Sequence, residues 1–175
     1  AGASITAAIL PGCASPPVAD TDLAAAAPSA PRSASAAQSA KAAPASKSRM
    51  VSIATPDGAC EAFFVAPEGG KHPGVLIWPD VAGLREAYQQ MATRLAEAGY
   101  AVLVVNPYYR ASKLPVMKTF AEWRTEEGKQ KIAPMRAALT PEAITKDAAA
   151  HLAWLDQQPE VDPQRKLATT GYCMG

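Results

Sequence analysis

A glycine-flanked cysteine after a β-branched run constrains the fold of this chain more than any other feature. Residues Leu167 to Thr170 favour a strand and lead directly into Gly171-Tyr172-Cys173-Met174-Gly175. The G-x-C-x-G spacing is that of a nucleophile elbow with cysteine in place of the usual serine. In such an elbow a strand turns sharply into a helix, so the nucleophile is strained and only glycines tolerate the close backbone contacts. We therefore predict that the Cys173 thiol projects from the sheet edge toward helix N–H groups, which favour the thiolate.

Other roles for the cysteines stay open at this point. A cysteine at the end of a buried strand is commonly a small apolar core residue. A redox role for Cys173 is weaker, because no C-x-x-C pair supplies a resolving thiol. The chain has three cysteines, Cys13, Cys60 and Cys173, which lack the close spacing of a zinc site, so no metal is expected. A Cys60–Cys173 disulfide is a disfavoured alternative, because it would disable the proposed nucleophile.

Composition and charge exclude several functions. At 175 residues the chain is long enough for one domain. Its formal net charge of +1 argues against nucleic-acid binding, which needs a strongly basic face. No stretch approaches the roughly 18 apolar residues of a membrane span. We expect neither a nucleic-acid partner nor a membrane-spanning segment.

The first 49 residues differ in composition from the rest. They are dominated by Ala, Pro and Ser, cannot bury enough apolar surface to offset their ordering entropy, and are expected to be a disordered leader. The apolar patch from Ile5 to Leu10 precedes Pro11-Gly12-Cys13, as at the end of an export signal. The protein could thus be exported, either periplasmic or lipid-anchored through Cys13, or it could stay cytoplasmic. The folded domain is expected over residues 50–175.

The pattern of the domain predicts an α/β fold. Met50 to Thr55 and Cys60 to Ala66 read as an antiparallel hairpin at the N-terminal end. Gly74 to Trp78 and Tyr100 to Val105 are continuous apolar runs, typical of strands buried on both faces of a parallel sheet. A helix expected from Leu84 to Ala98 joins them, and this order implies parallel pairing. The prediction is a mostly parallel sheet with an antiparallel hairpin.

Helical spacing predicts which side chains face the core. In the first helix they are Leu84, Tyr88, Met91 and Leu95. A second helix begins at Thr140-Pro141-Glu142, and its expected apolar face is Ile144, Ala148, Leu152 and Leu155. His151 lies on that face and is interpreted as a packing histidine. Residues 111–139 are expected to form short helices with Phe120 and Trp123 packed inward.

Three motifs together resemble the dienelactone hydrolase family of the α/β-hydrolase fold. They are Trp78-Pro79-Asp80-Val81-Ala82-Gly83-Leu84-Arg85, Asn106-Pro107-Tyr108-Tyr109-Arg110 and Gly171-Tyr172-Cys173-Met174-Gly175. They occur in the family's order, and the resemblance covers about residues 50–175. It implies a hydrolase of small esters or lactones that acts through an acyl-enzyme and needs no cofactor. We expect the complete protein to be a monomer.

The resemblance also implies roles for individual residues. Cys173 would be the nucleophile, and the backbone N–H groups of Val81 and Met174 would form the oxyanion hole. Asp80 holds the place of a family glutamate that contacts the resting thiol, although it could instead cap the helix expected at Leu84. Arg110, with Tyr109 beside it, would bind a substrate carboxylate.

The aspartate and histidine that complete the family's triad come from a later part of the chain. Neither His72 nor His151 sits where that histidine belongs, so the sequence is interpreted as truncated at the elbow and nearly inert by itself. An alternative function is a non-catalytic, hydrolase-like domain that binds a ligand or a partner. An aspartate and a histidine in downstream sequence would favour the enzyme.

Overall fold

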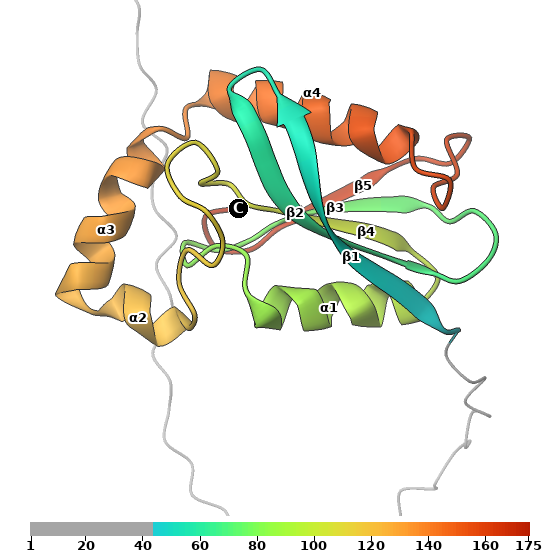
Figure 1. Ribbon diagram of the computed structural model, residues 1–175, viewed down its shortest axis with the longest axis horizontal. Coiled ribbons are helices and arrows are strands. Elements are labelled where there is room, and N and C mark those ends of the chain that lie inside the picture. Colours follow the sequence, from blue (N-terminus) through green and yellow to red (C-terminus); the bar gives the residue numbers. More distant parts are fainter. Residues whose placement is uncertain (1–43) are drawn as a thin grey trace, which may run out of the picture. The chain divides into compact units, whose positions relative to one another are not determined.

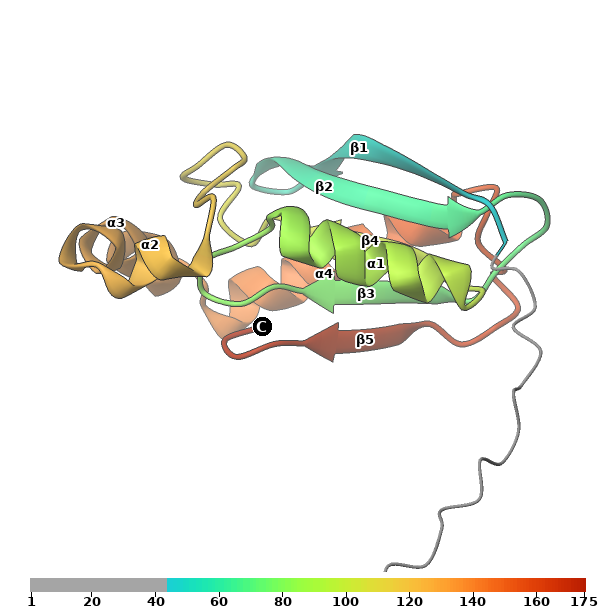
Figure 2. The same ribbon diagram turned by 90° about the horizontal axis from the view of Figure 1, so that it is seen from below.

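A computed structural model describes residues 44–175, and these form a sheet flanked by helices (Figure 1). Within this part of the chain the elements are β1 (Ser46–Thr55), β2 (Gly58–Pro67), β3 (Gly74–Trp78), α1 (Glu86–Glu97), β4 (Ala101–Val105), α2 (Phe120–Arg124), α3 (Glu126–Ala137), α4 (Pro141–Asp156) and β5 (Ala168–Gly171). The sheet has the strand order β1-β2-β4-β3-β5, which Figure 2 shows from top to bottom. The predicted export segment and Cys13 lie outside the described residues. None of the helices in residues 44–175 combines the length and the apolar character that crossing a membrane requires.

Strand pairing confirms the predicted α/β class. β1 and β2 form the antiparallel hairpin, while β3 pairs in parallel with both β4 and β5. β1 begins at Ser46, four residues before the expected start at Met50, and Ser46 lies opposite Pro67. The guanidinium of Arg49 donates to the Glu160 carboxylate at 2.7 Å. This polar part of β1 is therefore held by its pairing with β2 and by an ion pair, not by burial of apolar side chains.

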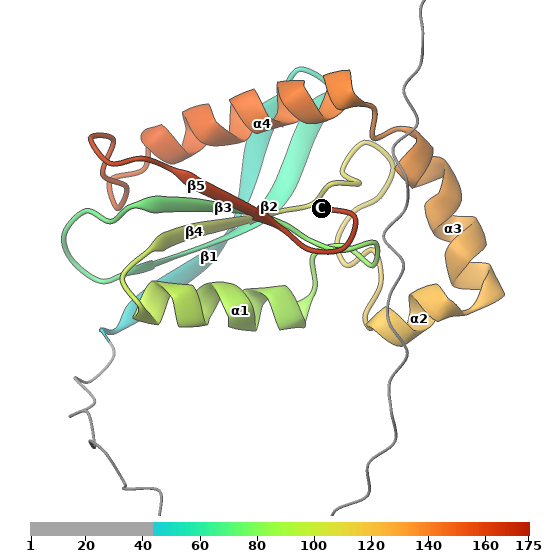
Figure 3. The same ribbon diagram turned by 180° about the vertical axis from the view of Figure 1, so that it is seen from behind.

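Alternate side chains of the inner strands face opposite helices, as the pleat of a strand requires. Leu76, Leu103 and Val105 pack in the layer under α4, and Val75, Ile77, Val102 and Val104 pack in the layer under α1. Figure 3 shows α1 and α4 on opposite faces of the sheet. The predicted core face of α1 is confirmed, because Leu84, Tyr88, Met91 and Leu95 all belong to its layer.

The predicted apolar face of α4 is wrong at its first turn. Ile144 is 39% exposed, and the buried residues of the helix are Asp147, His151 and Leu155. The helix is turned so that the Asp147 carboxylate reaches an arginine, which offsets the cost of burying the charge. His151 is buried with its ring centroid 5.7 Å from that of Trp78, which confirms the packing role expected for it.

A third apolar cluster lies beyond the carboxyl ends of the strands, where α2 and α3 pack (Figure 1). Its buried members are Val81, Ala82, Tyr108, Val116, Met117 and Ile132. Phe120 and Trp123 pack against it, as predicted, and so does Met174. The loops after β3, β4 and β5 therefore meet around one core.

Candidate active site

Cys173 adopts the strained backbone conformation expected of an elbow. Its φ is 59°, and within residues 44–175 it is the only residue other than glycine with a positive φ. An L-residue pays about 1–2 kcal/mol for the left-handed conformation. Cys173 is exposed, and both it and Cys60 are free thiols, so the described residues contain no Cys60–Cys173 disulfide. Strain of this kind is concentrated at functional sites.

The two glycines of the motif are required by close backbone contacts, as predicted. A Cβ on Gly171 would collide with the carbonyl oxygen of Gly175. A Cβ on Gly175 would collide with the carbonyl oxygen of Trp78 and lie 2.8 Å from that of Pro79. The N–H of Tyr172 donates to the Trp78 carbonyl at 3.2 Å. The elbow is thus seated directly against the end of β3.

The loop after β3 is fixed by hydrogen bonds along its backbone. The N–H of Asp80 donates to the Tyr88 hydroxyl at 2.9 Å, and the Asp80 carbonyl accepts from Gly83 N–H at 2.9 Å. Two residues further on, the N–H of Ala82 donates to the Asp80 carboxylate at 3.0 Å. Between them, the N–H of Val81 has no acceptor among residues 44–175. The N–H of Met174 has none among the same residues.

Tyr108, in the loop after β4, connects the β3 loop with the elbow. Its hydroxyl donates to the Val81 carbonyl at 3.0 Å and lies 3.3 Å from the Met174 sulfur. The ring centroid of Tyr88 on α1 is 5.7 Å from that of Tyr172 in the elbow. These contacts hold the Val81 and Met174 segments together, as an oxyanion hole made from two loops requires.

The Asp80 carboxylate is occupied by its own loop. Arg85 donates to its two oxygens at 2.7 and 2.8 Å, and both side chains are 12% exposed. Burial by itself would raise the pKa of Asp80, but the hydrogen bonds from Arg85, the Ala82 N–H and Tyr88 outweigh it and lower the pKa. The alternative that Asp80 caps the following helix is wrong, because the N-cap of α1 is Arg85 and no side chain caps it.

Arg110 and Tyr109 point their polar groups at protein side chains. The guanidinium of Arg110 donates to Asp147 at 2.8 Å through each of Nη1 and Nη2. Its Nε and Nη2 also donate to Asp57, at 3.0 and 2.6 Å. The Tyr109 hydroxyl donates to Asp147 at 2.7 Å and accepts from Thr55 at 2.7 Å. The guanidinium, which the resemblance would assign to a substrate carboxylate, is held here by two protein carboxylates.

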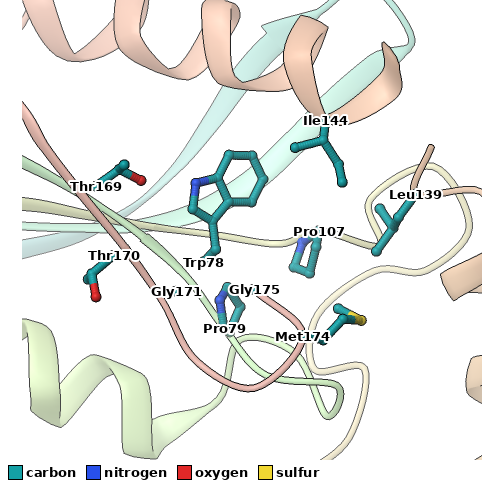
Figure 4. A pocket seen from close by; sticks show the side chains of 10 residues that line it. All are labelled: Trp78, Pro79, Pro107, Leu139, Ile144, Thr169, Thr170, Gly171, Met174 and Gly175. Atoms are coloured by element: carbon teal, nitrogen blue, oxygen red, sulfur yellow. The ribbon is translucent and has the colours of Figure 1, made fainter. Parts of the chain in front are cut away.

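A cavity of about 340 Å³ lies beside the elbow on the α4 side of the sheet (Figure 4). It is lined by Trp78, Pro79, Pro107, Leu139, Ile144, Thr169, Thr170, Gly171, Met174 and Gly175. The lining is mainly apolar, and it includes the residue after the thiol but not Cys173 itself. Cys173 is exposed and is not among the residues that line this cavity.

A family match identifies the group of proteins to which this domain belongs. The family model described as "Dienelactone hydrolase family" matches residues 60–175. The chain belongs to the dienelactone hydrolase family. This family membership agrees with the fold, the elbow and the loop that follows β3.

Relatives of this dienelactone hydrolase domain are longer than the chain. A Methylorubrum extorquens protein with the provisional name carboxymethylenebutenolidase is 28% identical over 127 residues, which are 71% of this chain and 40% of that protein. A solved dienelactone hydrolase-like promiscuous phosphotriesterase from metagenomic libraries is 28% identical with a TM-score of 0.55, covering 75% of this chain and 51% of the other. The solved structure called m3DLH is 30% identical with a TM-score of 0.54, covering 74% of this chain and 50% of the other. The chain thus spans about half the length of the solved relatives.

Neither histidine of the described residues reaches the thiol of this dienelactone hydrolase domain. His72 precedes β3, at the opposite end of the strand from the elbow. His151 is buried, and burial lowers its pKa to about 4 even though the nearby Asp147 acts to raise it. Within residues 44–175, no three His, Cys, Asp or Glu side chains gather as a metal site would require.

Three residues with structural contacts around the candidate site were not singled out from the sequence. They are Tyr108, Arg85 and Asp147. Tyr108 and Arg85 lie inside the motifs that carry the family resemblance. The sequence does not show which groups their side chains bind. The sequence held one signal for Asp147, which lies three residues after Ile144 and four before His151 and so shares a helix face with them. A buried carboxylate at such a position needs a cationic partner.

Proposed function

We propose that the full-length protein hydrolyses small esters or lactones through an acyl-enzyme on Cys173. The conformation of Cys173 carries the proposal: an exposed thiol at φ 59° on an elbow whose glycines contact the end of β3. Two backbone N–H groups without acceptors in the described residues, those of Val81 and Met174, support it. Such donors stabilise the negative charge that develops on a carbonyl oxygen during acyl transfer.

The proposed reaction has two steps. The Cys173 thiolate attacks the acyl carbon, a C–S bond forms, and the carbonyl electron pair moves onto the oxygen held by the Val81 and Met174 N–H groups. The intermediate collapses, the C–O bond breaks, and the alcohol leaves with one proton. Water then adds to the thioester, the C–S bond breaks, and the acid and the thiol are regenerated. In a lactone the acid and alcohol stay joined in one product.

The base that takes the thiol proton is assigned to a histidine outside residues 44–175. This follows the family resemblance, in which a histidine and an aspartate complete the triad. His151 does not serve, because its neutral imidazole is buried against Trp78. A positioned base contributes about 10²–10⁴-fold to such a reaction.

The substrate is proposed to be a small molecule with an activated acyl group. The relative's name, carboxymethylenebutenolidase, is consistent with lactone chemistry. We assign Asp80 as a positioning residue of the β3 loop, because Arg85 and the Ala82 N–H occupy its oxygens. Arg110 and Tyr109 are proposed to hold α4 and the hairpin near the site rather than to bind substrate.

The test is a burst experiment on the full-length protein with p-nitrophenyl acetate. We expect one equivalent of nitrophenol per protein, an acetyl group on Cys173 by peptide mass analysis, and loss of both in Cys173→Ala. Cys60→Ala is the matched control, because Cys60 is buried and burial raises its thiol pKa to about 12. Wild-type protein that is not acylated would instead support a non-catalytic binding domain.

A further inference from the structure

The Tyr108 hydroxyl bridges the two segments that carry the proposed oxyanion donors. It lies 3.0 Å from the Val81 carbonyl oxygen and 3.3 Å from the Met174 sulfur. A hydroxyl has one proton to donate, and a thioether sulfur is a weak acceptor. The proton therefore goes to the Val81 carbonyl, while the sulfur packs against the hydroxyl oxygen.

This hydrogen bond fixes one end of a peptide unit whose other end is also fixed. The carbonyl of Val81 and the N–H of Ala82 belong to the same planar peptide unit. Tyr108 binds the carbonyl, and the Asp80 carboxylate accepts from the N–H at 3.0 Å. The preceding unit, which carries the Val81 N–H, has its carbonyl bound by the Gly83 N–H at 2.9 Å. The direction of the Val81 N–H is thus fixed by hydrogen bonds to the peptide unit that contains it and to the peptide unit that follows it.

Tyr108 is itself held rigidly. It is 2% exposed, and its N–H donates to the side chain of the fully buried Asn106 at 3.0 Å. Burial raises the pKa of its hydroxyl, which therefore stays protonated and able to donate at neutral pH. Without this hydroxyl the Val81 carbonyl would lose a buried donor, and a buried carbonyl without a partner tends to rotate toward another one.

We propose that Tyr108 is a positioning residue of the oxyanion hole, acting through the Val81–Ala82 peptide. The inference rests on the proposed acyl-enzyme function. Tyr108 touches neither the thiol nor the acyl group in this assignment. Its effect is confined to steps in which a carbonyl oxygen becomes negative, because only then does the direction of the Val81 N–H matter.

The experiment compares two reactions of Cys173 in full-length wild type, Tyr108→Phe and Tyr100→Phe. Acylation by p-nitrophenyl acetate forms an oxyanion, whereas alkylation by iodoacetamide does not. For Tyr108→Phe we expect acylation to slow by about tenfold or more, with KM little changed and alkylation at the wild-type rate. Tyr100 is the control, because it is 38% exposed and lies just before β4, at the end away from the elbow.

The outcomes separate the two proposals. Acylation of Tyr108→Phe at the wild-type rate would overturn the role of Tyr108 and leave the proposed function intact. Equal slowing of acylation and alkylation would also overturn it, because it would indicate general damage to the elbow. Iodoacetamide also alkylates the thiols of unfolded chains, so the folded fraction of each variant is measured by circular dichroism and both rates are normalised to it. Wild-type protein that is not acylated at Cys173 would overturn the proposed function and this inference together.

Discussion

Arg110 and Asp147 form a two-pronged ion pair between the loop after β4 and the buried face of α4, with both N–O distances at 2.8 Å. The Asp147 side chain is 2% exposed and that of Arg110 is 18% exposed. The Arg110–Asp57 contact at 2.6 Å extends the tie to the turn of the hairpin. One guanidinium therefore joins three separate parts of the fold.

Arg110→Lys is expected to lower the free energy of unfolding by about 1.5–3 kcal/mol, because the buried Asp147 carboxylate loses hydrogen bonds from a charged donor. A lysine ammonium keeps the charge but cannot bridge two carboxylates in this geometry. Urea unfolding measures the change, with Arg165→Lys as the control because Arg165 is exposed. A loss of less than about 0.5 kcal/mol in the free energy of unfolding, as is usual for surface substitutions, would contradict the structural role of Arg110.

The same Arg110 variant tests the substrate role that the family resemblance implied. If Arg110 binds a substrate carboxylate, Arg110→Lys should raise KM for an ester that carries a carboxylate and leave KM for a neutral ester unchanged. We expect both KM values to change alike, since the guanidinium is held by Asp57 and Asp147.

Asp80→Asn and Arg85→Met are expected to slow Cys173 acylation to a similar degree, about three- to tenfold. Each breaks the same ion pair, and Asp80→Asn keeps an oxygen for the Ala82 N–H. The pH profile of Cys173 alkylation should stay the same in both. If Asp80 instead acts on the thiol directly, the two variants should shift that profile in opposite directions, because one removes a negative charge and the other leaves it unpaired.

The buried His151 should make stability depend on pH. Its pKa is lowered from 6.5 to about 4, so the unfolded chain takes up a proton at a higher pH than the folded chain. Its contribution is present above pH 6.5 and is lost as the pH falls toward 4. At about pH 5 the loss should reach about 2 kcal/mol. The groups that face the imidazole are Asp147, which raises its pKa, and Arg110, which lowers it.

Urea unfolding between about pH 7 and 5 measures this loss, with His151→Phe as the comparison because phenylalanine can keep the ring contact with Trp78. The variant should lose less stability on acidification than the wild type. Parallel curves for the two proteins would show that the imidazole is not buried in neutral form.

Residues 1–175 expressed alone should self-associate through β5. Among the described residues this strand pairs only with β3, and most of its residues are exposed. An open strand edge offers unpaired N–H and C=O groups to another chain. Light scattering and size-exclusion chromatography over a range of concentrations measure the effect, and Thr169→Lys should reduce it. A monomer at every concentration would show that the edge is protected.

The fold was predictable because its signals are local in the sequence. Continuous apolar runs marked β3 and β4, and two glycines around Cys173 marked a turn whose close contacts the structure confirms. The partners of charged groups were not predictable, because those partners lie far away in the sequence. Arg110 and Asp147, for example, are 37 residues apart. α4 buries Asp147 beside Arg110 and leaves Ile144 39% exposed, so apolar spacing alone placed Ile144 wrongly.

The pairing of β5 with β3 has a consequence for how the protein acquires reactivity during folding. Trp78 lies opposite Gly171, so the elbow reaches its seat only after segments 93 positions apart have found the correct register. Contacts of such long sequence separation form slowly, because a large loop must close first. A slip of one residue would displace the thiol by about 3.3 Å and reverse the faces of β5. Cys173 should therefore remain an ordinary thiol on the nascent chain and become a nucleophile only once the sheet is in register.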